Sequence, residues 1–211
     1  MRIRWLGHAC LVLESEAGTK VMADPFGEGV GYKLPREAVD LVTVSHDHYD
    51  HNAVGVLPGK PKVIKTAGQH QAAGVTIEGF PTFHDSQRGA SRGKNLMFLI
   101  IMDGLRVVHC GDLGHLLEPS LLESLKPVDV LLLPVGGVYT INGEEAHQLA
   151  EELQPRIIVP MHYQTPDGLI RLEPLEKFTQ YYPNFRRQKD LSLTRENLPS
   201  ETEVVVLDYP K

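Results

Sequence analysis

Several features that would define a protein class are scarce or missing in this chain of 211 residues. It has only two cysteines, Cys10 and Cys110, which lie in apolar strand-like segments and form no Cys-x-x-Cys pair. This argues against a disulfide framework or a thiolate metal site, and we expect both thiols to be reduced core residues. No apolar run is long enough to cross a membrane, and the residues after Met1 lack the apolar core of a signal peptide. We therefore expect a cytoplasmic protein with no membrane partner.

Positive charge is also in deficit, with 21 Lys and Arg residues against 27 Asp and Glu residues and a formal net charge of −6. Such a chain is a poor electrostatic match for nucleic acid, although a local basic pocket is compatible with it. Repeats, low-complexity segments and Gly/Ser-rich linkers are absent. The length fits one hydrophobic core, so we expect residues 1–211 to form a single domain. No pattern sets an oligomeric state, and a symmetric homodimer is the default expectation.

What the chain does contain is a loop crowded with metal-binding side chains, directly after the apolar run Leu41–Val44. Because strand residues alternate, His46 and His48 can point to one side of the strand end. Asp50 and His51 follow where a helix could begin, and they can reach a second point nearby. Imidazole with carboxylate suits zinc and other borderline divalent metals. One loop can therefore serve two adjacent ions, which typically lie about 3.5–4 Å apart and share a water molecule.

Two metals need more ligands than this loop supplies, and three candidates follow other strand-like segments. His84, Asp112 and His162 each lie at the end of an apolar run, which is a rigid place from which to project a ligand. A carboxylate has two oxygens and can span two ions. The predicted ligand sets are His46, His48 and His84 for one metal and Asp50, His51 and His162 for the other, with Asp112 between the two.

The hydrophobic patterning indicates a layered α/β protein. Asp103-Gly104 predicts a hairpin, and Asn142 with Glu145 resembles a helix capping box. The expected strands are 3–6, 10–13, 19–23, 41–44, 63–66, 75–83, 96–102, 105–110, 129–134, 156–160 and 203–208, and the expected helices are 115–125, 142–153 and 172–182. Two sheets packed face to face, with helices outside, would use all these elements.

The motif His-x-His-x-Asp-His, followed by a strand-end His, a Gly-Asp pair and a late strand-end His, resembles the metallo-β-lactamase superfamily of metal-dependent hydrolases. The match runs from Gly7 to Tyr163. It implies an αββα sandwich of two packed mixed sheets with helices on the outer faces and the site at one edge between the sheets. It also implies that Asp24 orders the ligand loop without binding metal.

Three shorter motifs resemble a small single-domain branch of that superfamily, which includes the ascorbate-6-phosphate lactonase-like proteins. They are Leu6–Ala9, Arg92–Asn95 and Gly111–His115. The chain lacks the large insertions of the nuclease and lactamase branches, so the resemblance leaves the substrate open.

A further group of residues has both a functional and a structural interpretation. His8 could face the site, orient a ligand or form a hydrogen bond in the core, and His115 could cap its helix or line the pocket. Arg92 lies in the cationic loop 88–94, which is either a solvated turn or a clamp for a phosphate or carboxylate. Tyr139 follows the glycine pair 136–137, where the backbone can approach a ligand closely. We take Arg92, Tyr139 and His115 as candidate substrate-binding residues and His8, like Asp24, as a candidate supporting residue.

The leading hypothesis is a metal-dependent hydrolase that attacks an ester, lactone or phosphoester of a small anionic molecule with metal-activated water. Asp50 would position that water and accept its proton. The rivals are a phosphodiesterase or nuclease, a diiron oxidoreductase and a non-catalytic metal-binding protein. The diiron members of the superfamily resemble His-x-Glu-x-Asp-His, whereas this chain has His48 at the glutamate position. Zinc is the favoured metal, with manganese, nickel and iron as alternatives.

Overall fold

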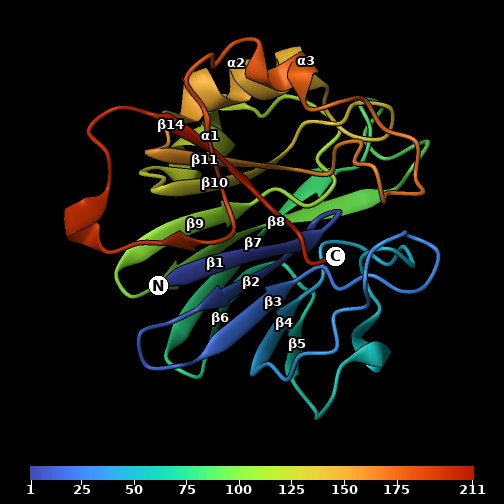
Figure 1. Ribbon diagram of the computed structural model, residues 1–211, viewed down its shortest axis with the longest axis vertical. Coiled ribbons are helices and arrows are strands. Elements are labelled where there is room, and N and C mark those ends of the chain that lie inside the picture. Colours follow the sequence, from blue (N-terminus) through green and yellow to red (C-terminus); the bar gives the residue numbers. More distant parts are fainter.

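The computed structural model describes residues 1–211 and consists of two β-sheets packed face to face (Figure 1). The six-stranded sheet has the order β13 (Leu191–Ser192), β1 (Arg2–Gly7), β2 (Cys10–Glu14), β3 (Lys20–Ala23), β4 (Leu41–Thr43) and β5 (Lys62–Ile64). The eight-stranded sheet has the order β12 (Arg186–Gln188), β14 (Glu203–Leu207), β11 (Ile157–Met161), β10 (Val130–Pro134), β9 (Leu105–His109), β8 (Lys94–Met102), β7 (Val75–Phe83) and β6 (Gly68–Ala72). Both sheets are mixed, because parallel pairs such as β10–β11 occur beside antiparallel pairs such as β7–β8.

Side-chain alternation along the strands places the core between the sheets. Trp5 of β1 and Leu11 of β2 belong to the central cluster shared with the second sheet, whereas Val12 belongs to a smaller cluster on the outer face. Neighbouring residues of a strand point to opposite faces, which explains the division. Cys10 and Cys110 are buried and unpaired, as predicted.

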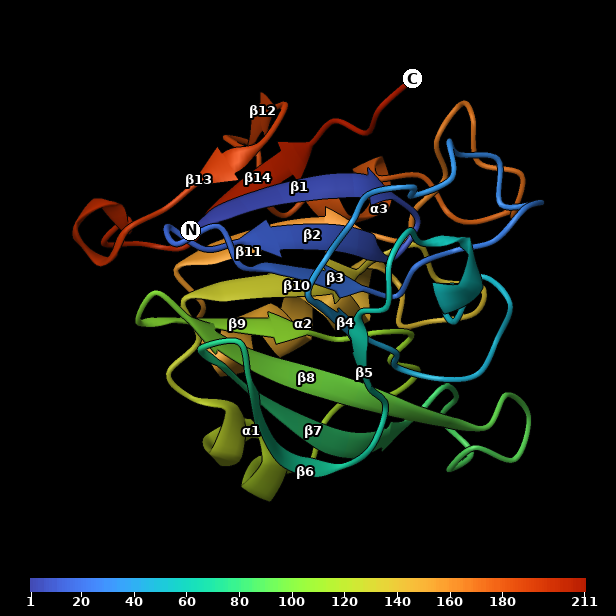
Figure 2. The ribbon, with the colours of Figure 1, turned by 90° about the horizontal axis from the view of Figure 1, so that it is seen from below.

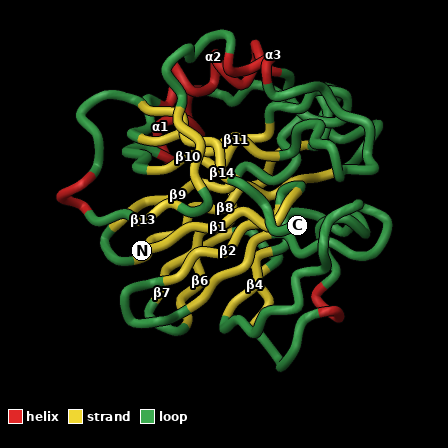
Figure 3. The backbone as a smooth tube through the Cα atoms, in the orientation of Figure 1, coloured by secondary structure: helices red, strands yellow, loops and turns green.

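The three α-helices lie on the outer side of the eight-stranded sheet (Figure 3). They are α1 (Pro119–Leu125), α2 (Gly143–Leu153) and α3 (Glu176–Thr179). The other sheet is covered by the loop that contributes Phe26 and Val30 and by the 3₁₀ helix η1 (Val54–Val56). The predicted sandwich is confirmed, with loops supplying most of the layer over the six-stranded sheet. None of the helices has the length and apolar character needed to span a bilayer.

Helix boundaries follow the local hydrogen-bonding chemistry. Asn142 caps α2 in the predicted capping box, because its side chain accepts from the Glu145 backbone and the Glu145 carboxylate accepts from the Asn142 N–H. The helix expected over residues 172–182 is reduced to α3. Glu173 instead donates its N–H to the carbonyl of Gly136, and Pro174 forms a β-bridge with Gln164, so this segment is extended.

Strands β6, β12 and β13 are not among the predicted strands, because they are short or polar. The burial pattern of β6 shows no buried residue, and β13 has only two residues. Their backbones are ordered by pairing with the longer strands β7, β14 and β1, which is a tertiary effect. In Figure 2, β12, β13 and β14 lie beside β1 at one side of the sandwich.

Candidate metal centre

The predicted ligands come from both sheets and meet at one edge of the sandwich. His46 follows β4, His84 follows β7, Asp112 follows β9 and His162 follows β11, and all four side chains are buried. His162 also donates its backbone N–H to the carbonyl of His8, which follows β1, at 3.0 Å. This bond joins the ends of the two sheets beside the histidine cluster.

Asp24 sets the tautomers of two of these histidines. Its Oδ2 accepts from Nδ1–H of His51 at 2.9 Å and from the Ser45 hydroxyl at 2.5 Å, while Oδ1 accepts from the Ser45 backbone N–H at 2.8 Å. Because the Ser45 hydroxyl donates to Asp24, its oxygen accepts from Nδ1–H of His46 at 2.8 Å. In their neutral forms both imidazoles therefore carry the proton on Nδ1, which leaves the Nε2 lone pair to bind a metal ion or a second proton.

His84 is oriented in the same way by a different acceptor. Its Nδ1–H donates to the backbone carbonyl of Tyr139 at 3.1 Å, which leaves Nε2 to face Asp112 at 3.1 Å. A hydrogen bond at one ring nitrogen that frees the other is the usual arrangement of a metal-binding histidine.

Asp112 lies at the centre of the cluster. Its Oδ2 is 3.1 Å from Nε2 of His84, 3.2 Å from Nε2 of His51 and 3.3 Å from Nε2 of His162. Its Oδ1 and the Nε2 atoms of His46 and His51 are buried without a hydrogen-bond partner. Lone pairs facing one another in a dry interior are costly unless a cation or a proton lies between them. The donor set therefore fits a divalent metal.

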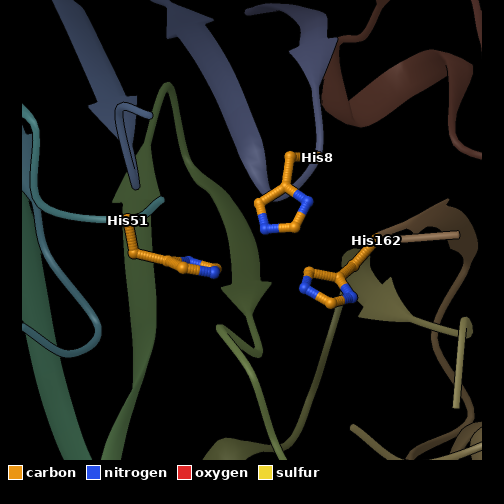
Figure 4. A group of neighbouring side chains, drawn as sticks. All are labelled: His8, His51 and His162. Atoms are coloured by element: carbon orange, nitrogen blue, oxygen red, sulfur yellow. The ribbon is translucent and has the colours of Figure 1, made fainter. Parts of the chain in front are cut away.

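The candidate ligand atoms fall into three overlapping groups, of which one joins Asp24 to His46 and His51. His46, His48 and His84 have ligand atoms within 4.8 Å of one another, and so do His8, His51 and His162. Figure 4 shows the second group, in which the three rings converge from separate parts of the chain.

Asp50, predicted for that second group, lies beside it. Its Oδ2 accepts from Nε2–H of His8 at 3.1 Å and is 3.8 Å from Nε2 of His51. His8 is thus a direct partner of the predicted water-positioning carboxylate.

The electrostatics of the cluster follow from burial and crowding. Burial, aided by the neighbouring His162, lowers the pKa of His8 to about 4, and burial with the neighbouring His51 lowers the pKa of His46 to about 3. His51 differs. Although burial opposes its charge, Asp112 and Asp24 hold its pKa well above the ordinary value. In the metal-free protein a proton on His51 therefore supplies the positive charge that the two carboxylates require.

The backbone after β9 is fixed by contacts that only glycine permits. Gly111 has φ +55°, and a Cβ there would lie 2.4 Å from Oδ1 of Asn95 and 2.6 Å from Cβ of Ser45. Asn95 in turn accepts from the Asp112 N–H at 3.0 Å and donates to the carbonyl of Cys110 at 2.9 Å. The central carboxylate is thus positioned by its own strand end and by β8.

A cleft of about 640 Å³ opens beside the first histidine group. Its lining includes His46 and His48 together with the cations Lys65, Arg92 and Lys94. Such a volume is typical of small-molecule sites. The predicted cationic residue Arg92 therefore lies beside the candidate metal ligands.

The cationic loop is ordered by a residue that the sequence did not single out. Asp85 accepts backbone N–H bonds from Gln87, Gly89, Ser91 and Arg92 at 2.7–3.0 Å. Although desolvation opposes it, these four bonds lower the pKa of Asp85 to about 2. An Asp three positions before the cationic loop 88–94 resembles many surface turns, so only the folded loop shows its role.

Tyr139 and His115 are placed differently from the residues that line the cleft. The Tyr139 ring packs against Arg92, whose guanidinium carbon is 5.2 Å from the ring centroid. His115 accepts from the Phe83 N–H at 3.2 Å and donates to the carbonyl of Leu116 at 2.7 Å. Both of its ring nitrogens are therefore engaged with backbone, and neither residue lines the cleft.

Comparisons with known proteins agree with this geometry. The beta-lactamase superfamily domain family matches residues 2–162. A UPF0173 metal-dependent hydrolase of Methanoregula boonei is 36% identical over 194 residues, covering 78% of this chain and 83% of that protein. A second UPF0173 metal-dependent hydrolase, from Pyrococcus abyssi, is 31% identical to this chain. The match covers 78% of this chain and 85% of that protein.

A crystal structure from Thermotoga maritima, described as that of a candidate Zn-dependent hydrolase of the metallo-β-lactamase superfamily, is similar over nearly the whole chain. It is 38% identical, has a TM-score of 0.84 and covers 99% of both chains. The sandwich, the histidine–aspartate cluster at its edge and these relatives lead to one conclusion: the chain belongs to the metallo-β-lactamase superfamily and is a metal-dependent hydrolase.

Proposed function

We propose that the chain binds two divalent ions, with zinc favoured, and hydrolyses an ester, lactone or phosphoester of a small anionic substrate. His46, His48 and His84 would hold one ion, and Asp50, His51 and His162 the other, with Asp112 between them. The grouping of the imidazoles and the central position of the Asp112 carboxylate support these sets. When bound, the ions lower the pKa of a water molecule and polarise the bond under attack.

The residues of the chain prepare this chemistry before any substrate arrives. Asp24, Ser45 and the Tyr139 carbonyl fix the histidine tautomers, so the nitrogen lone pairs face inward. Little reorganisation is then needed when the site is loaded, and preorganisation of this kind is a large part of catalysis.

Asp50 is suited to orient the attacking water. Although burial opposes it, the hydrogen bond from His8 lowers the pKa of Asp50, so the carboxylate is ionised across the physiological range. His8 supports this role by holding Oδ2 at 3.1 Å. A strongly acidic carboxylate orients a proton donor better than it stores the proton, so we assign orientation as its main task.

The anionic character of the substrate rests on one observation, the cationic lining of the cleft beside His48. Lys65, Arg92 and Lys94 line it together with the single carboxylate Asp47, on a chain whose formal net charge is −6. Arg92 is held in place by a hydrogen bond to the carbonyl of Val138 at 3.1 Å. A fixed guanidinium suits a carboxylate or phosphate in two-point contact.

The test compares matched substrates on protein loaded with zinc. A chromogenic ester carrying a free carboxylate and its neutral methylated analogue would be assayed, with a lactone and a bis-phosphodiester as further classes. Lys94→Gln should raise KM for the anionic ester about tenfold, as expected for the loss of a charge-assisted contact, and leave the neutral ester unchanged. Lys60→Gln, an exposed lysine outside the cleft, is the control.

Two results would contradict the proposal. Equal effects of Lys94→Gln on the charged and neutral esters would remove the anion-binding role of the cleft. Activity on the bis-phosphodiester alone would favour the phosphodiesterase alternative, and iron content with oxygen consumption would favour the diiron oxidoreductase. Repeating the assays with manganese, nickel and iron identifies the metal that supports turnover.

A further inference from the structure

His48 is the one exposed member of the proposed ligand set and therefore marks the entrance to the metal centre. Asp50 is half-buried, and the other proposed ligands are buried. A substrate that reaches the ions passes His48 on its way. The cationic cleft lies beside this histidine and accounts for an anion on the substrate. The residues around the rest of the entrance decide what else the substrate carries.

Two segments that adjoin this entrance expose large apolar side chains. Tyr49, which follows His48 in the ligand loop, is 60% exposed. Val138 and Tyr139, in the turn after β10, are 52% and 38% exposed. The carbonyl of Tyr139 accepts from Nδ1–H of His84, whose ring centroid is 5.2 Å from that of His48. Both segments are thus joined to the same pair of imidazoles, and none of the three side chains lines the cationic cleft.

The position of these side chains gives their exposure a meaning. Single exposed apolar side chains are ordinary on a protein surface, whereas several of them beside an opening indicate a binding site. Covering such a surface with the apolar part of a ligand releases water and favours binding. Tyr139 offers less free surface than its neighbour, because the Arg92 guanidinium carbon lies 5.2 Å from the centroid of its ring. Tyr49 and Val138 therefore form the main apolar surface at the entrance.

The backbone of Val138 provides a second, independent observation. Its φ is +50°, in the left-handed region that β-branched residues rarely adopt. This turn lets two successive carbonyls act as acceptors, that of Val138 for the Arg92 guanidinium at 3.1 Å and that of Tyr139 for His84 at 3.1 Å. Glycine or asparagine would adopt the same turn at lower cost, so these bonds do not account for a valine. Backbone strain of this kind is typical of functional sites.

From this juxtaposition, and resting on the hydrolytic function proposed above, we propose that the substrate carries a bulky apolar group as well as an anion. The apolar group lies against Tyr49 and Val138 at the entrance beside His48, while the anion lies in the cationic cleft. The substrate class is thereby narrowed to an ester, lactone or phosphoester with an alkyl or aromatic group of several carbons. Tyr49 and Val138 are then the residues that determine specificity for this group.

The probe is a series of alkylphosphonates from ethyl to hexyl, whose binding to zinc-loaded protein is measured by isothermal titration calorimetry. The anionic head group is constant, so differences within the series report the apolar group alone. Binding requires no turnover, and the result is therefore independent of the reaction. The dissociation constant should fall about twofold for each added methylene, and so about 16-fold from ethyl to hexyl, because a partly exposed surface provides about half the free energy of full burial.

Two variants and one matched control test the contacts. Tyr49→Ser should reduce the gain from ethyl to hexyl to about fourfold, since about half of the apolar contact is lost. Val138→Asn should reduce the gain similarly and also raise the urea midpoint, because asparagine tolerates the left-handed backbone. Tyr181→Ser removes another exposed tyrosine, which stacks on His147 of α2, and should keep the wild-type gain. Zinc content is measured on every sample, and a Tyr49→Ser protein that loses zinc leaves Val138→Asn to decide.

Equal dissociation constants for ethylphosphonate and hexylphosphonate in the wild type would overturn the proposal. So would a wild-type gain in both Tyr49→Ser and Val138→Asn, because the alkyl group would then bind elsewhere. If the carboxylate-bearing ester is hydrolysed while the phosphonate series is flat, the hydrolytic function stands and only the apolar contact falls. A full gain along the series in a protein inactive on every substrate class would support the apolar contact and contradict the hydrolytic function.

Discussion

Asp24→Asn is expected to separate the orientation of the metal ligands from metal binding itself. The wild-type carboxylate accepts three hydrogen bonds, from the Ser45 N–H, the Ser45 hydroxyl and Nδ1–H of His51. An asparagine has the same shape but only one accepting oxygen. If that oxygen faces Ser45 N–H, the new NH₂ group faces His51 and drives its proton from Nδ1 to Nε2. If the amide turns over, two N–H groups face each other at Ser45.

The expected loss of metal affinity follows from the number of hydrogen bonds that the substitution removes. A hydrogen bond to a charged group contributes roughly 1.5–3 kcal/mol, and at least one such bond is lost in either orientation. The protonated Nε2 of His51 cannot bind a metal. We expect metal affinity to fall by about 10–100-fold, which corresponds to about 1.4–2.7 kcal/mol.

The assay is competition for zinc against a chelator of known affinity, with metal content and far-UV circular dichroism measured on the same samples. Asp47→Asn is the matched control, because Asp47 lies in the same loop with its side chain 77% exposed and contacts only Lys65 at 3.7 Å. A folded Asp24→Asn protein that binds zinc as tightly as Asp47→Asn would refute the orienting role. Loss of folded structure in Asp24→Asn would instead require the same comparison with Ser45→Ala, which removes the hydroxyl that links Asp24 to His46 and leaves the Asp24 hydrogen bond to His51 in place.

Three further outcomes are expected. Gly111→Ala should destabilise the protein by about 3 kcal/mol in urea denaturation, because the added Cβ meets Asn95 at 2.4 Å in a left-handed backbone, and an unchanged midpoint would contradict this. Metal-free protein should be most stable near pH 6.5. The folded-state pKa values of His8 and His46, about 4 and about 3, lie below 6.5, so the unfolded chain binds more protons and stability falls as the pH drops from 6.5 to 4. The raised pKa of His51 adds stability below pH 6.5 that is lost as the pH rises, and a urea midpoint that climbs steadily to pH 8.5 would contradict this assignment. His8→Gln should lower kcat more than KM while leaving zinc content near wild type, and loss of one zinc equivalent would make His8 a ligand instead.

The regular elements could be predicted because they are encoded locally. Strand β7 has the predicted bounds, and α2 begins at the predicted cap, since alternation and capping chemistry are written in adjacent residues. Strand β13 and the shortened α3 could not be predicted, because their conformation depends on pairing with distant segments. The same limit applies to the site. Ser45 and Asp85 are ordinary polar residues in the sequence, and their hydrogen bonds to Asp24 and to the cationic loop exist only after folding.

By itself, the sequence determined the kind of chemistry, because His46–His51 places imidazoles and carboxylates at a spacing that serves few purposes other than metal binding. It also indicated the strands that carry the other proposed ligands. Only the tertiary structure decided which atoms face inward. The tautomers of His46 and His51 depend on Asp24, which is more than 20 residues away in the chain, and His8 reaches Asp50 across 42 positions. Side-chain direction and proton position are set by hydrogen bonds between segments that the packing of two sheets brings together, and no local pattern encodes them.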